Sequence, residues 1–197
     1  MMTNDQLKAI GIDEKWLQPL LDVFEKYQIN TPKRQASFIG QCMHESGNFK
    51  IVEENLHYKP DRLHAVFPSR FPTVESALPF DTPEKIANKI YGGRMGNLED
   101  GDGFKFRGRG LVQLTGRDSY KSFSDATGVD AINNPDLLLQ PEYACLSAGW
   151  YWNKRNLNMA ADASDYKTMT QRINGGLLGL DDRIAKIQNV EKILGGS

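Results

Sequence analysis

Apolar residues recur at helical spacing along most of the chain. In the segment 13–27 they fall three or four positions apart, at Leu17, Leu20, Leu21, Phe24 and Tyr27. This spacing puts them on one face of an α-helix. Pro19 lies inside the pattern and lacks a backbone N–H, so we expect the helix to break or start late there.

Capping residues mark the ends of the other predicted helices. Thr3 and Gln6 form a capping box for a short helix that ends near Gly11. Pro32 follows the favourable N-cap Thr31 and opens a helix that Gly47 should stop. Further helices are expected over residues 61–67, 82–91, 118–127, 141–154, 166–173 and 179–194, with breaks at 134–135, 156–158 and 174–176.

The segment 92–110 contains seven glycines, too many for a helix. Its Asp-Gly repeat at 100–103 superficially resembles a calcium loop, but the later ligands and the closing Glu are absent. Its end at 108–110 is not followed by the Lys and Ser/Thr of a phosphate loop. We therefore expect a long loop without a metal, and then a short extended segment at 111–114.

These elements predict a mainly α fold in one domain over residues 1–197, with a long central loop and at most a very small β element. The length suffices for a buried core. A composition of 40% hydrophobic and 25% charged residues is ordinary for a soluble globular protein. The formal net charge of −1 argues against a nucleic-acid groove, which would need a basic excess.

Two cysteines, Cys42 and Cys145, lie in apolar helical contexts, so we expect buried reduced thiols and no disulfide. Residues 1–6 have neither the basic nor the apolar region of a signal peptide. No stretch approaches the roughly 20 apolar residues of a membrane span. We therefore expect synthesis in the cytosol.

Glu45 is the first candidate for chemistry. Phe38, Cys42 and Glu45 fall at i, i+4 and i+7, so the carboxyl group continues an apolar stripe. It also lies in the last turn of its helix, where the helix dipole disfavours negative charge. A general acid needs such surroundings near neutral pH. The alternative is an edge residue that pairs with a Lys or Arg.

Glu54 completes a possible acid pair. The helix ends near Gly47, so a chain that turns back can place Glu54 across a cleft from Glu45. Inverting glycosidases separate their two carboxyl groups by about 6.5–9.5 Å, which leaves room for a water molecule. Glu53 competes for the second role, and both residues could instead form a solvated turn.

Polar residues farther along are candidates for sugar binding. In an extended segment Gln113 and Thr115 would point to the same side, where an amide and a hydroxyl suit a sugar; a polar strand edge is the alternative. Asn174 could end a helix or accept a ligand next to two glycines. Arg183 lies in the first turn of the final helix, an unfavourable place for a cation, so we expect a carboxylate to hold it.

The histidines and the aromatic cluster are better explained by structure. His44, His57 and His64 lack the spacing of a zinc helix, and a His beside a carboxylate usually forms a hydrogen bond. At least two of the three aromatic residues at 150–152 should face the core. No nucleophile elbow or Cys/His pair suggests acyl transfer.

Several motifs in order resemble glycoside hydrolase family 19, specifically the compact phage and prophage endolysins related to plant chitinases. The resemblance runs from about residue 35 to residue 183. The motifs are His-Glu-Ser-Gly at 44–47, Glu-Asn-Leu-x-Tyr at 54–58, Ile-Ala-Asn at 86–88 with Tyr91, Arg-Met-Gly-Asn at 94–97, Gly-Arg-Gly-Leu-Val-Gln-Leu-Thr-Gly at 108–116, Asn-Pro-Asp at 134–136 and Ile-Asn-Gly-Gly at 173–176.

This resemblance implies a helical, lysozyme-like bilobal fold and an inverting mechanism without metal or cofactor. Glu45 matches the general acid and Arg183 the family's cleft arginine. Other substrate-binding positions are expected at His44, Tyr58, Gln113, Thr115, Ser119 and Asn174. Ser119 replaces an Asn of the plant chitinases, and their second acid lies farther along the chain than Glu54, which makes Glu54 the weaker match.

The expected function is that of an endolysin, which hydrolyses the β-1,4 bond between N-acetylmuramic acid and N-acetylglucosamine in peptidoglycan. The alternatives are a chitinase and a wall-binding module without catalysis. The expected partners are glycan strands and a holin-type membrane pore that lets a monomeric enzyme reach the wall in the periplasm. With a net charge near zero, attraction to an anionic wall is left to local patches.

Overall fold

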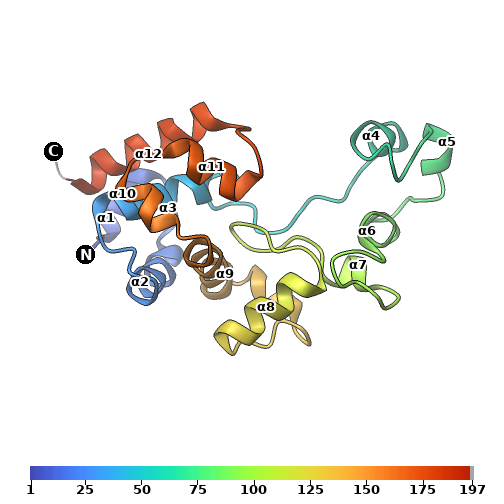
Figure 1. Cartoon of the computed structure of the whole chain (residues 1–197), viewed down its shortest axis with the longest axis horizontal. Coiled ribbons are helices and arrows are strands. Elements are labelled where there is room, and N and C mark those ends of the chain that lie inside the picture. Colours follow the sequence, from blue (N-terminus) through green and yellow to red (C-terminus); the bar gives the residue numbers. More distant parts are fainter. Residues whose placement is uncertain (196–197) are drawn as a thin grey trace. The chain divides into compact units, whose positions relative to one another are not determined.

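The computed structural model describes residues 1–195, which are mainly helical (Figure 1). The only bridges of β type in this range are isolated, between Glu53 and Arg109 and between Arg109 and Leu114. The helices are α1 (Asn4–Ile10), η1 (Glu14–Trp16), α2 (Leu17–Lys26), α3 (Pro32–Glu45), α4 (Pro60–Val66), α5 (Val74–Ala77), α6 (Pro83–Tyr91), α7 (Asp102–Lys105), α8 (Arg117–Thr127), η2 (Pro135–Leu139), α9 (Pro141–Lys154), α10 (Leu157–Asp162), α11 (Tyr166–Asn174) and α12 (Leu180–Gly195).

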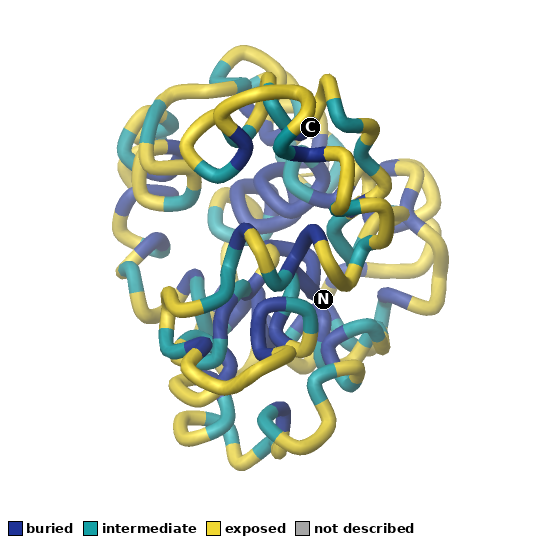
Figure 2. Tube along the Cα trace, turned by 90° about the vertical axis from the view of Figure 1, so that its right-hand side faces the viewer, coloured by how far each residue is buried: buried dark blue, intermediate teal, exposed yellow. Residues whose placement is uncertain are grey.

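The chain forms two compact units. Among the described residues the first comprises 1–52, 110–113 and 137–195, and the second 53–109 and 114–136. Each has its own apolar core, and buried and exposed positions alternate along the helices of both (Figure 2). Within residues 1–195, none of the helices combines the length and the apolar character that a bilayer span requires.

In the first unit α3 packs along α12, and Gly40 of α3 allows the two helices to approach closely. A Cβ atom at Gly40 would lie 2.5 Å from the side chain of Ile187 and 2.8 Å from its backbone nitrogen. The two helices therefore meet almost backbone to backbone. This packing brings the end of α3 beside the first turns of α12, where the candidate acid and Arg183 lie.

The caps of this unit are as the sequence predicts. Thr3 and Gln6 form both bonds of the capping box, and Thr31 caps α3 with Pro32 at its first position. Pro19 lies in the first turn of α2, so the helix starts late, after a short 3₁₀ turn. Cys42 and Cys145 are buried free thiols, and burial raises the pKa of each.

A left-handed turn follows α3 directly. Gly47, Asn48 and Phe49 have φ angles of 55°, 61° and 67°. Ser46 holds the turn, because its hydroxyl donates to the carbonyl of Cys42 and accepts the N–H of Phe49. The ring of Phe49 packs edge-on against Trp16, 5.2 Å between ring centroids. The backbone after the candidate acid is thus fixed in a conformation that residues other than glycine rarely adopt.

The second unit contains α4 to α8 and a smaller apolar core around Leu63, Phe71 and Ile86. An ion pair between buried Asp102 and partly exposed Arg117 joins α7 to α8. Both oxygens of Asp102 accept from Arg117, at 2.9 Å and 3.0 Å, and this hydrogen bonding lowers the pKa of Asp102. The Asp-Gly repeat therefore supplies an internal contact.

Two expectations for the central segment are wrong. The loop over 92–110 contains the short helix α7, since Gly103 fits directly against the backbone of Ala87 in α6. Residues 111–114 form a turn and not an extended segment. The left-handed φ of 105° at Gly110 starts this turn, and the bridge between Arg109 and Leu114 closes it. The sequence reading also missed α5, α10 and η2, which are each six residues long or shorter.

Candidate active site

Glu45 is the last residue of α3, and its carboxylate pairs with Arg183 of α12. Oε1 of Glu45 lies 2.6 Å from Nη2 of Arg183, and the side chains are 27% and 1% exposed. The apolar stripe predicted for α3 is present, with Cys42 buried one turn and Phe38 two turns before the acid. The acid is thus partly sheltered and one of its oxygens is fixed.

Arg183 uses each of its nitrogens. Beside the bond to Glu45, Nη1 donates to Oε1 of Gln41 at 2.7 Å and Nε donates to the carbonyl of Leu178 at 3.0 Å. Gln41 precedes Glu45 by one turn of α3, so the same helix face supplies both acceptors. The carboxylate that the sequence predicted as partner of Arg183 is that of Glu45. Glu45 therefore pairs with an arginine, as the alternative interpretation expects. This pairing is compatible with a role as general acid.

His44, next to Glu45 in α3, also contacts the first turn of α12. Its Nδ1 lies 2.6 Å from Oδ2 of Asp182, and its ring packs on Gly179, where a Cβ atom would lie 2.3 Å from Cε1. Lys186 also binds Asp182 at 2.8 Å. Hydrogen bonds from Lys186 and His44 lower the pKa of Asp182. His44 thus forms a hydrogen bond with a carboxylate, but the partner is Asp182 of α12 and not the neighbouring Glu45.

Glu54 belongs to the second unit, and within residues 1–195 its carboxylate accepts hydrogen bonds from two neutral donors. The hydroxyl of Tyr91 donates to Oε1 at 2.8 Å, and the backbone N–H of Gly108 donates to Oε2. Burial and the nearby Glu54 carboxylate raise the pKa of Tyr91, so its hydroxyl keeps its proton. The carboxylate is oriented through both oxygens while its charge is not neutralised.

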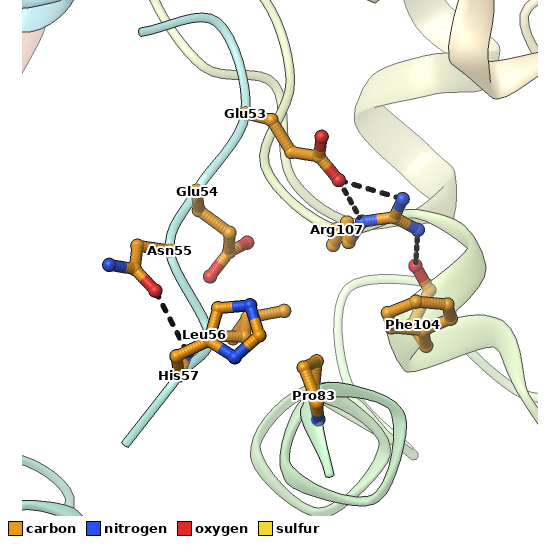
Figure 3. A pocket seen from close by; sticks show the side chains of 8 residues that line it. All are labelled: Glu53, Glu54, Asn55, Leu56, His57, Pro83, Phe104 and Arg107. Carbon is orange, nitrogen blue, oxygen red and sulfur yellow. Dashed lines mark hydrogen bonds and ion pairs between the residues drawn. The ribbon is translucent and has the colours of Figure 1, made fainter.

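Glu53 is placed differently. Its Oε1 accepts from Nε and Nη2 of Arg107, both at 2.8 Å. Figure 3 shows this ion pair beside Glu54 in a pocket of about 370 Å³ within the second unit. The pocket is lined by Glu53, Glu54, Asn55, Leu56, His57, Pro83, Phe104 and Arg107. Of the two neighbouring acids, Glu53 forms an ion pair within residues 1–195, whereas Glu54 is held by a hydroxyl and a backbone N–H.

The predicted sugar-binding residues are spread over both units. Gln113 is exposed at the end of the turn in the first unit, whereas Thr115 and Ser119 are half-buried in the second. The expectation that Gln113 and Thr115 share one side of a strand fails, because no strand forms there. Tyr58 packs edge-on against Phe67, 5.6 Å between ring centroids.

Asn174 ends α11 and is exposed. The C-cap that we considered for this segment is present, since Gly175 has a φ of 82° and its N–H donates to the carbonyl of Gln171. The side chain of Asn174 takes no part in this cap, so the cap and a ligand contact are compatible.

Three further residues hold the candidate acids and are not predicted by the sequence pattern: Gln41, Tyr91 and Arg107. Gln41 had a usable signal, its position one turn before Glu45. Tyr91 stood in a recognised motif without a role, and Arg107 had no local signal because its partner is 54 positions away. Among residues 1–195 no three His, Cys, Asp or Glu side chains gather as a metal site would require.

Comparison with known proteins identifies the class. A glycosyl hydrolase family 19 domain-containing protein of Haemophilus influenzae is 42% identical over 153 residues, 76% of this chain and 74% of that protein. An acidic 27 kDa endochitinase of Solanum lycopersicum is 36% identical over 95 residues, 38% of each protein. No family model matches the chain.

Solved structures share the fold. Chitinase C from Streptomyces griseus superimposes with a TM-score of 0.69 at 20% identity, over 98% of this chain and 92% of that one. A bacterial family 19 chitinase gives a TM-score of 0.65 at 23% identity, over 98% and 94%. The mainly α, lysozyme-like fold expected from the sequence is confirmed. The protein is a glycoside hydrolase, and the chain belongs to glycosyl hydrolase family 19.

Proposed function

We propose that this enzyme is an endolysin that hydrolyses the β-1,4 bond between N-acetylmuramic acid and N-acetylglucosamine in peptidoglycan, with inversion. The observation that carries the mechanism is the contrast between the two carboxyl groups. Glu45 is held by a buried cation, and Glu54 is held by neutral donors. An inverting glycosidase needs two carboxyl groups, one as general acid and one as general base, and these two groups are held in different ways.

Glu45 is the general acid in this proposal. Arg183 binds Oε1 and so fixes the direction of the carboxyl group, while the partial exposure of the side chain leaves it open to the leaving oxygen. Donation of the proton turns Glu45 into an anion. The preorganised guanidinium stabilises that anion as it forms, which lowers the barrier to glycosidic cleavage.

Glu54 is the general base. Tyr91 and Gly108 orient its carboxylate without neutralising it, so it can take a proton from the attacking water. Glu53 is the poorer base because Arg107 already binds its carboxylate. Gln113, Thr115, Ser119, Asn174, His44 and Tyr58 are proposed to contact the sugars.

Peptidoglycan is proposed as the substrate because the motifs most resemble those of the endolysin branch. Two buried free thiols also suit a chain that folds in a reducing cytosol. In this proposal a monomer passes a holin-type membrane pore and acts on glycan strands in the periplasm. Chitin is the second candidate, favoured by the relatives and solved structures named as endochitinases and chitinases.

Release of reducing ends separates the candidates. The enzyme is incubated in parallel with purified sacculi and with soluble N-acetylglucosamine oligomers, and new reducing ends are quantified. Release from sacculi alone supports the endolysin, and release from the oligomers alone makes the protein a chitinase.

Glu45→Gln distinguishes catalysis from mere wall binding, because the amide keeps the shape but cannot donate this proton. The variant should bind sacculi normally and lose rate by roughly 10²–10⁴-fold. If the wild type binds sacculi without releasing reducing ends, a wall-binding module replaces the enzyme proposal.

A further inference from the structure

The first unit contains a second hollow, built from other residues than the candidate acid site. It has a volume of about 570 Å³ and is lined by parts of α1, η1 and the left-handed turn after α3. Each of these three segments contributes one lysine, Lys8, Lys15 and Lys50. We call this hollow the lysine pocket.

The charge of the lysine pocket is not balanced internally. Asp13 is the acidic residue of its lining, and its Oδ1 already accepts the backbone N–H of Lys15. Within residues 1–195 the lysine ion pairs are formed by Lys85, Lys121 and Lys186, and none involves a lysine of this pocket. Three cations and one anion therefore leave the lining with an excess of two positive charges.

Two buried aromatic residues belong to the lining of the lysine pocket. Trp16 is 2% exposed and Phe49 is 4% exposed, and their rings pack edge-on. Phe49 holds its left-handed backbone through the bond from its N–H to buried Ser46. Strained backbone that the surrounding structure maintains is more frequent at binding sites than elsewhere. Because Phe49 precedes Lys50, the backbone at Lys50 is held in place, while its side chain is exposed.

We propose that the lysine pocket is an auxiliary binding site for an anionic polymer of the cell envelope. Its ligand chemistry is a series of carboxylate or phosphate groups, which complement the three lysines of the lining. The formal net charge of −1 gives the protein no general attraction to polyanions. Any binding to an anionic polymer would therefore depend on a local cluster of positive charge such as this one. The choice of an envelope polymer as ligand rests on the proposed function, whereas the positive charge of the pocket does not.

Binding to purified sacculi tests the proposal separately from catalysis. All variants of the full chain carry Glu45→Gln so that the polymer is not cut during co-sedimentation. The test variant has Lys8, Lys15 and Lys50 replaced by Ala. The matched control has the exposed Lys33, Lys167 and Lys192 of the same unit replaced by Ala, which removes the same charge. Thermal unfolding verifies that all variants fold.

The lysine-pocket variant should bind sacculi roughly tenfold more weakly at low ionic strength, from three modest exposed ion contacts, and the control less than twofold. Added salt should weaken the binding of the parent and the control more than that of the pocket variant. Equal binding by the two triple variants, or parent binding that is independent of salt, overturns the proposal.

A second arm distinguishes the source of the anions. Sacculi stripped of other polymers offer carboxylates, and long-chain inorganic polyphosphate offers phosphates. Pocket-dependent binding to either supports the site and names its anion. If active enzyme carrying Glu45 cleaves no sacculi while pocket-dependent binding persists, the proposed function fails and the site stands.

Discussion

Arg183 is the residue on which the surroundings of the candidate acid depend. It is buried, and it joins a carboxylate, an amide and a backbone carbonyl through three different nitrogens. The planar guanidinium directs separate N–H donors at these three partners. Lysine cannot replace it, because the donors of an ammonium group all lie on one nitrogen atom. The same contacts fix the direction of the Glu45 carboxyl group.

Arg183→Lys should therefore lower kcat by roughly 100-fold, in the range found when one preorganised electrostatic partner is removed. KM should change little, because Arg183 is 1% exposed and its nitrogens already bind Glu45, Gln41 and Leu178. Steady-state kinetics on sacculi or oligomers measure both values, and circular dichroism verifies the fold. A kcat within a few-fold of wild type would show that Arg183 is only structural.

We expect opposite effects on the rate from substitution of the two neighbouring acids of the second unit. Glu54→Gln should lose about 10²–10⁴-fold in rate, because the amide cannot take a proton from water. Glu53→Gln should retain most of the rate, because it removes an ion pair with Arg107 that is 41% exposed on the Glu53 side. Lysis of outer-membrane-permeabilised Gram-negative cells compares the two. If only the Glu53 variant is inactive, the base assignment is reversed.

The sequence could indicate Glu45 and Arg183 because local rules apply to them: an apolar stripe that ends in an acid, and a cation in the first turn of a helix. Their mutual contact was open, since 138 positions separate them along the chain. Tyr91 and Arg107 act through partners 37 and 54 positions away, and no periodicity encodes such contacts. Residue roles that depend on tertiary packing therefore needed the structure.

At the scale of elements, the packing of α3 on α12 carries the acid site. Gly40 makes this packing possible, because a Cβ atom there meets the backbone of Ile187 as well as its side chain. Boundaries of long helices could be predicted from caps and periodicity, and α9 was expected at the residues where it lies. Short elements such as α7 were missed, since contact with α6 and not local propensity stabilises them.

Gly40→Ala should lower the free energy of unfolding by about 2 kcal/mol, a typical value for overpacking. It should also lower kcat, because α3 carries Glu45 away from Arg183 as the helices separate. Urea unfolding and kinetics test the two effects. Adding Ile187→Ala should restore only part of the stability, since the clash with the backbone of residue 187 remains. Full recovery would limit the role of Gly40 to side-chain space.

The link between α7 and α8 predicts a pH dependence. Arg117 lowers the pKa of Asp102 below its unfolded value of roughly 3.9. The carboxylate therefore stabilises the fold above about pH 4, and this contribution is lost as the pH falls through the lower folded-state pKa. Asp102→Asn should lower the free energy of unfolding by about 1–3 kcal/mol at pH 7. The difference from wild type should shrink below about pH 4; a constant difference would contradict the argument.

For the whole molecule, the sequence was sufficient to predict a mainly helical enzyme and its family. It did not show that residues 110–113 belong to the first unit while 114–136 belong to the second, because a unit formed from separate segments leaves no boundary in composition. It also did not show the lysine pocket, whose three lysines come from separate segments.

The identity of the new reducing end tests the central claim most directly. Purified sacculi are digested, the products are reduced with borohydride, and the terminal sugar alcohol is determined by mass spectrometry. Hydrolysis by an endolysin of the proposed type produces muramitol ends with the wild type, and roughly 10²–10⁴-fold more slowly with Glu45→Gln. Glucosaminitol ends, or muramitol ends at an unchanged rate with Glu45→Gln, would contradict the proposed bond or the proposed acid.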